Sequence, residues 1–157
     1  VLHADWRTSA EKGLKDQDKD TRLQFALLLA DGPEGDALKV LVADGLQHSD
    51  HHLRESCAET LANHGSDRGL AVLLDMLTRR ENPYLKANPK ADASTKELLQ
   101  KAFQDEKVRV CGLLGNLGNP GASSALTEAA KSSQADLAAA AKAALEKIRA
   151  AREPKKS

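Results

Sequence analysis

The densest group of chemically active side chains in the sequence is HSDHHLRES, residues 48 to 56. His48 and His52 are four positions apart, and Glu55 follows three positions later. On one continuous helix, this spacing places metal ligands on a common face. A metal site at His48 and His52 is therefore one hypothesis. The alternative is that the histidines lie at a joint between two helices, where the common face is lost.

A second stretch, CGLLGNLGNPG at residues 111–121, is rich in glycine but does not contain the lysine and hydroxyl of a phosphate-binding loop. Gly112 and Gly115 are expected to allow close helix packing, and Gly118 and Gly121 to form a turn. Ser123-Ser124 follows without the flanking glycines of a nucleophile elbow. The sequence therefore predicts no catalytic residue and no cofactor.

Composition limits the possible partners. The chain has 157 residues, with 23 Lys+Arg and 23 Asp+Glu, so its net charge is zero. A nucleic-acid binder needs a basic face, so nucleic acid is not expected as a partner. Aromatic residues make up only 3% of the chain, which disfavours a sugar cleft or a base-stacking surface. No apolar run approaches the roughly 18 residues that would span a bilayer, so membrane insertion is not expected.

Two further features concern cysteine usage and the start of the chain. Cys57 and Cys111 are far apart and fall on apolar helix faces, so we expect two buried free thiols. The sequence opens with VLHADW and has no initiator methionine there, which indicates a piece of a longer chain. Localisation is left open for this reason, with the cytoplasm favoured.

Behind these motifs lies a repeat. Asp-x-x-x-Arg, followed by small and apolar residues at helical spacing, begins at Asp18, Asp50 and Asp105. Arg22 and Arg54 are 32 residues apart, and a further 32 residues leads to Lys86 in a weaker copy. QADLAAAAKAALEKI, from Gln134, is the last copy. Repetition near 30 residues indicates a solenoid.

The periodicity within each copy is helical, and a second amphipathic stretch follows each first helix. Gly32-Pro33, Gly65 and the segment 118–121 are expected to end first helices. The predicted second helices are 35–47, 68–80, 95–104 and 121–132. No alternating β-branched run occurs, so the fold class is all-α: a right-handed solenoid of stacked helical hairpins.

The pattern DHHLRESCAETLANHG resembles the short HEAT-like repeat named for phycobilisome lyases, nearly position for position. The resemblance covers most of the chain and implies one repeat domain over 1–152, followed by a basic tail at 153–157. Its repeats lie near 18–48, 50–80, 82–104, 105–132 and 134–152, and residues 1–17 end a preceding repeat. A chromophore lyase or a DNA glycosylase built on such repeats remains an alternative function.

The repeated residues have structural roles in this interpretation. Aspartates at the start of each first helix are expected to accept hydrogen bonds from the free N–H groups of the first turn. The arginines lie where the helix dipole disfavours a cation, so each needs a capping aspartate or a neighbouring repeat as partner. The resulting ladder consists of Asp18, Arg22, Asp50, Arg54, Asp105 and Arg109.

The third copy departs from the pattern. Pro83 is acceptable at a first helical position, whereas Pro89 would interrupt the helix that contains Lys86. Residues 87–94 are therefore predicted to form a loop or a broken helix. In a repeat array such a departure is also a candidate functional segment.

Taken together, these features predict a monomeric, non-catalytic scaffold that binds a protein or peptide. A purely structural spacer is the main alternative. The resemblance implies that second helices line the concave side, where mixed charge suits a polar partner. The solvent-facing positions expected there are Asp36, Lys39, Asp44, Asp75, Arg79, Glu97, Lys101, Thr127 and Glu128.

Overall fold

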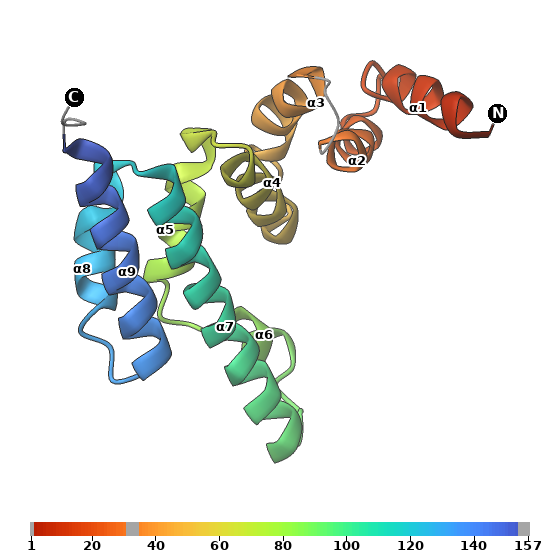
Figure 1. Ribbon diagram of the computed structural model, residues 1–157. Coiled ribbons are helices and arrows are strands. Elements are labelled where there is room, and N and C mark those ends of the chain that lie inside the picture. Colours follow the sequence, from red (N-terminus) through yellow and green to blue (C-terminus); the bar gives the residue numbers. More distant parts are fainter. Residues whose placement is uncertain (1, 31–34, 154–157) are drawn as a thin grey trace. The chain divides into compact units, whose positions relative to one another are not determined.

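The computed structural model describes residues 2–30 and 35–153, with side chains from residue 8 onward (Figure 1). The predicted stop at Gly32-Pro33 and residues 154–157 of the predicted tail lie outside the described residues. Within the described ranges the chain forms only helices and their connections, which confirms the all-α prediction. The helices group into two compact units, residues 1–72 and residues 73–157.

The first unit is a series of short helices connected by tight turns. It contains α1 (Leu2–Gly13), α2 (Lys19–Leu29), α3 (Gly35–Val40) and α4 (His51–Asn63). A π-helical turn, Leu41–Gly45, extends α3, and Leu46 N donates to Leu41 O at 3.0 Å. A 3₁₀ turn, Asp67–Gly69, leads into α5 (Leu70–Thr78). The structure thus contains the predicted second helices 35–47 and 68–80, each formed by an α-helix joined to a π-helical or 3₁₀ turn.

The core of the first unit depends on close approach between helices. Leu23, Leu41, Cys57 and Leu61 are almost completely buried there. A Cβ added at Gly45 would lie 2.4 Å from Cys57 Sγ, so no larger residue fits where the π-helical turn meets α4. This packing holds the second helix of one hairpin against the first helix of the next.

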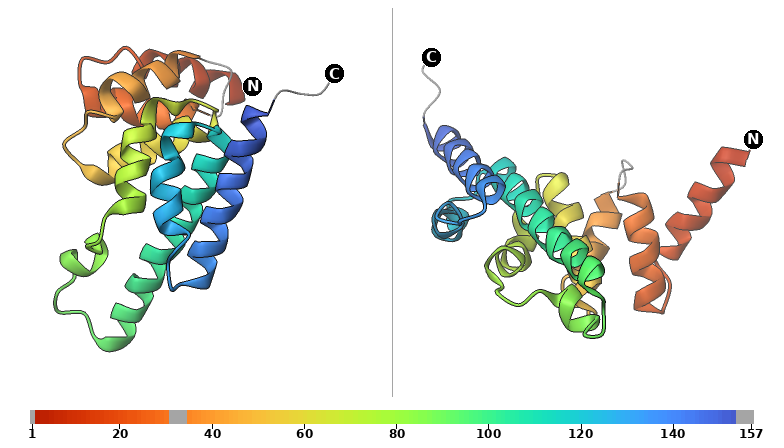
Figure 2. Two further views of the ribbon diagram at one scale, coloured as in Figure 1. Left: turned by 90° about the vertical axis from the view of Figure 1, so that its left-hand side faces the viewer. Right: turned by 90° about the horizontal axis from the view of Figure 1, so that it is seen from below.

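The second unit is built around one long helix. After α5 come α6 (Pro83–Ala87), α7 (Ala93–Leu117), the 3₁₀ turn Pro120–Ala122, α8 (Ser123–Ala129) and α9 (Ala135–Arg152). Figures 1 and 2 show α9 lying along the C-terminal half of α7, while the N-terminal half extends beside α6. The helices α8 and α9 also pack against each other.

Turn residues act largely as their sequence suggests. Gly65 and Gly118 follow α4 and α7 with φ of 72° and 66°, a conformation that glycine adopts without strain. Gly115 approaches α9 so closely that an added Cβ would lie 2.8 Å from Ala144 Cα, which confirms its packing role. The same prediction for Gly112 is wrong, because nothing lies within 4 Å of a Cβ there.

The predicted helix break at Asp105 is also wrong. Helix α7 is 25 residues long and continues without a break through Asp105. The repeat borders expected at 104 and 105 therefore fall inside this helix. No glycine or proline occurs between residues 93 and 111 to end the helix. The Asp105 carboxylate accepts from Lys101 Nζ at 2.6 Å, one helical turn away, instead of capping a helix.

The loop predicted for residues 87–94 is present in a shorter form. Helix α6 ends at Ala87, and α7 begins at Ala93. Asp92 caps α7 by accepting from Thr95 N at 2.7 Å. Pro89 lies between the two helices, where its missing N–H removes no helical hydrogen bond.

Candidate functional site

The repeated aspartate caps the first helix of each hairpin in the first unit. Asp18 Oδ2 accepts from Thr21 N at 2.7 Å, and Asp50 Oδ1 accepts from His52 N at 2.8 Å. These backbone hydrogen bonds hold the pKa of both carboxyl groups below the ordinary value. The capping predictions for Asp18 and Asp50 are therefore confirmed.

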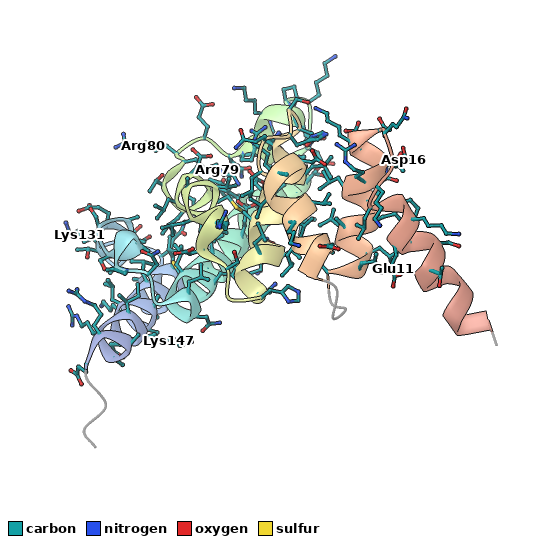
Figure 3. The ribbon with its side chains drawn as sticks, turned by 90° about the horizontal axis from the view of Figure 1, so that it is seen from above. Glu11, Asp16, Arg79, Arg80, Lys131 and Lys147 are labelled. Carbon is teal, nitrogen blue, oxygen red and sulfur yellow. The ribbon has the colours of Figure 1, made fainter. Side chains whose placement is uncertain are left out.

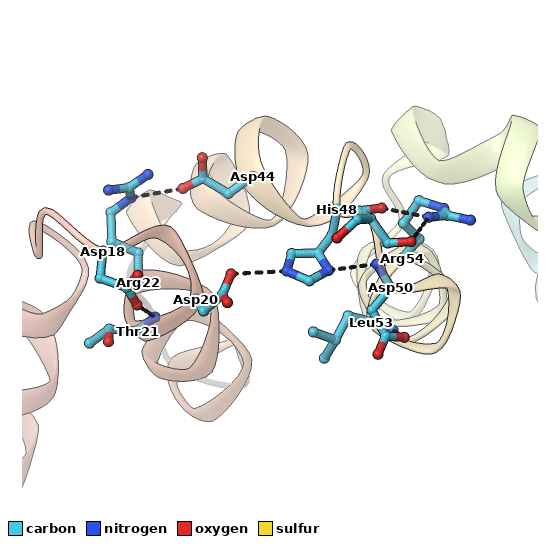
Figure 4. Close-up of polar contacts among 10 residues, drawn as sticks. Asp18, Asp20, Thr21, Arg22, Asp44, His48, Asp50, Leu53 and Arg54 are labelled. Carbon is cyan, nitrogen blue, oxygen red and sulfur yellow. Dashed lines mark hydrogen bonds and ion pairs between the residues drawn. The ribbon is translucent and has the colours of Figure 1, made fainter.

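The repeated arginine binds the turn that precedes its own helix, and Figure 4 shows this arrangement for Arg54. Arg22 Nη1 donates to the carbonyls of Asp16 and Gln17 at 2.7 and 3.0 Å. Arg54 Nη1 donates to the carbonyls of His48 and Ser49 at 2.5 and 2.8 Å. In both copies the acceptors lie six and five residues before the arginine. The arginine thus satisfies carbonyls left at the end of the preceding repeat.

Arg22 has an additional partner in the second helix of its own hairpin. Its Nε donates to Asp44 Oδ2 at 2.8 Å, and this hydrogen bond raises the pKa of the guanidinium. Only 20% of the Asp44 side chain is exposed. The expectation that Asp44 faces solvent on a partner-binding groove is therefore wrong, because its carboxylate is used within the fold.

His48 connects two successive hairpins. Its side chain is 8% exposed, Nε2 lies 2.9 Å from Asp20 Oδ1, and Nδ1 accepts from Asp50 N at 3.0 Å. Because Nδ1 accepts, Nε2 carries the proton and donates to Asp20. Figure 4 shows the ring between α2 and the start of α4. The joint hypothesis accounts for His48 without any metal.

The metal hypothesis gains no support from this geometry. Each ring nitrogen of His48 already makes one hydrogen bond, so binding a metal at either nitrogen would break that bond. His52 Nδ1 lies 3.9 Å from Glu55 Oε2, and its side chain is 57% exposed. Among the described residues no group of three or more histidine, cysteine or acidic side chains is arranged to hold a metal ion.

The third copy begins with asparagine in place of aspartate but keeps the same spacing from the preceding copy. Asn82 caps α6 by accepting from Tyr84 N at 2.9 Å and Leu85 N at 3.3 Å. The three caps at Asp18, Asp50 and Asn82 are therefore 32 residues apart. Lys86 holds the arginine position, and its Nζ reaches Glu81 at 3.4 Å on the surface. The sequence placed a weaker copy of the repeat near residue 82 but gave Asn82 no capping role, although Asn82 lies four residues before Lys86 as each aspartate precedes its arginine.

A buried polar cluster stabilises the second unit. Glu106 is 3% exposed, and its Oε1 accepts from Arg79 Nη2 at 2.5 Å. The Tyr84 hydroxyl donates to the other carboxylate oxygen. Lys107 Nζ donates to the Arg79 carbonyl at 2.6 Å, and burial lowers the pKa of this lysine. None of these contacts was predicted from the sequence.

Arg79 was expected to face solvent on the groove, and this expectation is wrong because its side chain is only 15% exposed. Figure 3 shows Arg79 among the helices, whereas the neighbouring Arg80 points outward. Arg109, the last arginine of the predicted ladder, is exposed on α7. Seven other predicted groove residues are exposed within their own units: Asp36, Lys39, Asp75, Glu97, Lys101, Thr127 and Glu128.

Two open hollows flank α3 in the first unit. The first hollow measures about 300 Å³ and lies between α3 and α4, with a lining that includes Leu38, Lys39, Val42, Leu61, Ser66 and Arg68. The second hollow measures about 350 Å³ and lies between α1 and α3, lined by Glu11, Leu14, Lys15, Asp36, Lys39 and Val40. Lys39 borders both hollows, and we call the two together the surface across α3.

Both cysteines are buried free thiols, as expected. Burial raises the pKa of Cys57 and of Cys111 to about 11. Thiols of this kind are weak nucleophiles at neutral pH. None of the helices that the structure describes has the length and hydropathy to cross a membrane.

Helical hairpins joined by a repeated Asp–Arg turn define the class of this protein as an all-α solenoid. The family model for HEAT repeats matches residues 9–88, slightly more than half of the chain, and the chain belongs to this family. The match ends one residue after α6, next to the loop where the regular repeat gives way to α7. No curated protein matches the sequence. The phycobilisome-lyase subtype suggested by the sequence stays a prediction.

Proposed function

We propose that this chain is a non-catalytic protein-interaction module that binds a protein or peptide through the exposed side chains of its second helices. The observation that carries the proposal is the contrast between the repeated arginines of two first helices and several exposed acidic residues of the second helices. At the start of the first helices, Arg22 and Arg54 bind backbone carbonyls and are committed to the fold. On the second helices, Asp36 and Asp75 are exposed.

The hollows beside α3 support the same proposal. Each is large enough to accept a side chain of a partner, and each combines apolar walls with charged edges. Interfaces of this composition obtain specificity from the placement of charge around apolar contacts. Membership of the HEAT-repeat family agrees with this role, because repeat solenoids commonly provide extended binding surfaces.

The test compares two charge-reversed double variants of equal net charge. Asp75→Lys/Glu97→Lys alters two predicted groove positions, on α5 and on the N-terminal half of α7, and Glu146→Lys/Glu153→Lys is the control at exposed positions near the C-terminal end of α9. Each variant is used as bait against a cell extract, and captured proteins are retested as purified components. We expect the first variant to lose a partner that the control retains.

Two results would contradict the proposal. If both variants keep every partner with unchanged affinity, these second-helix positions do not bind the partner. If wild-type protein captures nothing that binds as a purified component, the chain acts as a structural spacer.

A further inference from the structure

We infer that the surface across α3 recognises an acidic peptide segment that also carries apolar side chains; the inference rests on the proposed function and specifies the partner's chemistry. The first hollow provides the main evidence. Its walls are the apolar side chains of Leu38, Val42 and Leu61, and its charged residues are Lys39 and Arg68. No carboxylate lines it among the described residues.

The two cations differ in how far they are neutralised. Lys39 Nζ donates to Asp36 Oδ1 at 2.7 Å, and this hydrogen bond raises the pKa of the lysine. The Arg68 guanidinium is exposed and makes no hydrogen bond or ion pair in the part of the chain that the structure describes. Arg68 therefore lacks the carbonyl acceptors that Arg22 and Arg54 have, and it is available to an external carboxylate.

A third polar group, Ser66, lies at the same hollow. Ser66 is half-buried at the start of the 3₁₀ turn, but its side chain makes no capping hydrogen bond. Its hydroxyl can donate to a carboxylate that Arg68 binds through two parallel N–H groups. The apolar walls then accept a neighbouring side chain of the same peptide.

The second hollow extends this recognition along the partner. Leu14 and Val40 provide apolar surface there, and Lys15 has no ion-pair partner among the described residues. The carboxylates of Glu11 and Asp36 balance the positive charges of the lysines in this hollow. The hollow therefore favours an apolar side chain of the partner over a charged one. A peptide that crosses α3 would therefore place its carboxylates near Arg68 and apolar side chains in both hollows.

The experiment uses the full chain and synthetic peptides of about 12 residues, capped at both ends. The test peptide has a central leucine with two glutamates on each side, in a glycine-serine background. One matched peptide replaces leucine with serine, and another replaces glutamate with lysine. A single-stranded oligonucleotide of similar length tests for a phosphate ligand. Binding is measured by fluorescence anisotropy and by backbone amide shifts in nuclear magnetic resonance spectra.

We expect the glutamate-leucine peptide to bind on the order of tenfold more tightly than either matched peptide, with shifts centred on Leu38 and Val42. Arg68→Glu should weaken binding by about the same factor. The matched control Arg80→Glu changes the same net charge at an exposed position in the other unit, and it should leave binding unchanged. Circular dichroism verifies that both variants are folded.

Several results would overturn the inference. Equal losses for Arg68→Glu and Arg80→Glu would mean that overall charge, not this surface, attracts the peptide. Equal binding of the lysine or serine peptide, or tighter binding of the oligonucleotide, would mean that the partner chemistry is wrong. If no peptide binds but a purified partner is still lost through Asp75→Lys/Glu97→Lys, only this inference fails and the proposed function stands.

Discussion

At the scale of single residues, the repeated Asp-x-x-x-Arg pattern divides one task between two side chains. The aspartate satisfies N–H groups at the start of a helix, and the arginine satisfies carbonyl groups of the turn just before it. The two side chains therefore stabilise the joint between repeats from opposite directions.

The capping carboxylates lead to a prediction about acid stability. The pKa of Asp18 and Asp50 is lowered in the folded state, so their stabilisation is present above the ordinary carboxyl pKa. It is lost as pH falls through the folded-state pKa. Asn also caps helices but does not titrate. Asp18→Asn/Asp50→Asn should therefore lose less free energy of unfolding between pH 5 and pH 2.5 than wild type.

Urea titrations at both pH values measure this difference. Asp75→Asn is the control, because the carboxylate of Asp75 caps no helix. An equal decrease in wild type and the double variant would show that the two caps do not contribute to the acid dependence.

The buried pair of Arg79 and Glu106 gives a second prediction at this scale. Arg79→Met leaves the Glu106 carboxylate buried without its cation, which should cost about 3–5 kcal/mol of unfolding free energy. Adding Glu106→Met removes the uncompensated charge and should recover much of that loss. Chemical denaturation of both single variants and the double variant measures the coupling, and additive losses would contradict it.

At the scale of elements, the helical hairpins can be predicted from the sequence where capping residues, glycine and proline mark the helix ends. The caps of α2 and α4, the stop at Gly65, and the loop around Pro89 could all be predicted, because each depends on backbone preferences of nearby residues. The continuity of α7 could not be predicted from the repeat pattern alone. Asp105 matches that pattern, but its carboxylate accepts a hydrogen bond from Lys101, and no glycine or proline occurs between residues 93 and 111 to end the helix.

The candidate site was predictable only in part. A helical pattern can place Asp36 and Asp75 on a solvent-facing stripe, and both are exposed. It cannot show that Arg22 reaches Asp44 or that Glu106 binds Arg79, since those partners are 22 and 27 residues apart. The hollows beside α3 were also outside sequence reasoning, because their walls come from different helices.

Two glycines of α7 provide a prediction with an internal control. Gly115 lies against Ala144, so Gly115→Leu should overpack the contact with α9 and cost about 1–3 kcal/mol. Gly112 is exposed and has open space around its Cα, so Gly112→Ala should stabilise the helix by about 0.5–1 kcal/mol. Thermal unfolding of the two variants should therefore shift in opposite directions; two shifts of the same sign would refute this account.

At the scale of the whole molecule, each compact unit contains one buried thiol. Cys57 belongs to the first unit and Cys111 to the second, and burial raises the pKa of both to about 11. At pH 8 only about one such thiol in a thousand is ionised in the folded state. Labelling by a thiol reagent therefore requires the unit to open.

This arrangement allows the stability of each unit to be measured separately. Cys111→Ala leaves a reporter in the first unit, and Cys57→Ala leaves one in the second. We expect both variants to react slowly without denaturant and much faster in urea, each with the midpoint of its own unit. Fast labelling of either thiol in native buffer would contradict the burial described above.

Because α7 is uninterrupted, insertions and deletions should be tolerated at different places in this part of the coding sequence. Each residue added to an α-helix turns everything beyond it by about 100° and moves it by about 1.5 Å. One codon inserted between Lys101 and Glu106 would thus rotate either the buried carboxylate away from Arg79 or the preceding turns away from α6. One codon inserted at Pro89, between the helices, would be absorbed by the loop. Length variation in this region should therefore concentrate in residues 88–92 and spare the helix that follows.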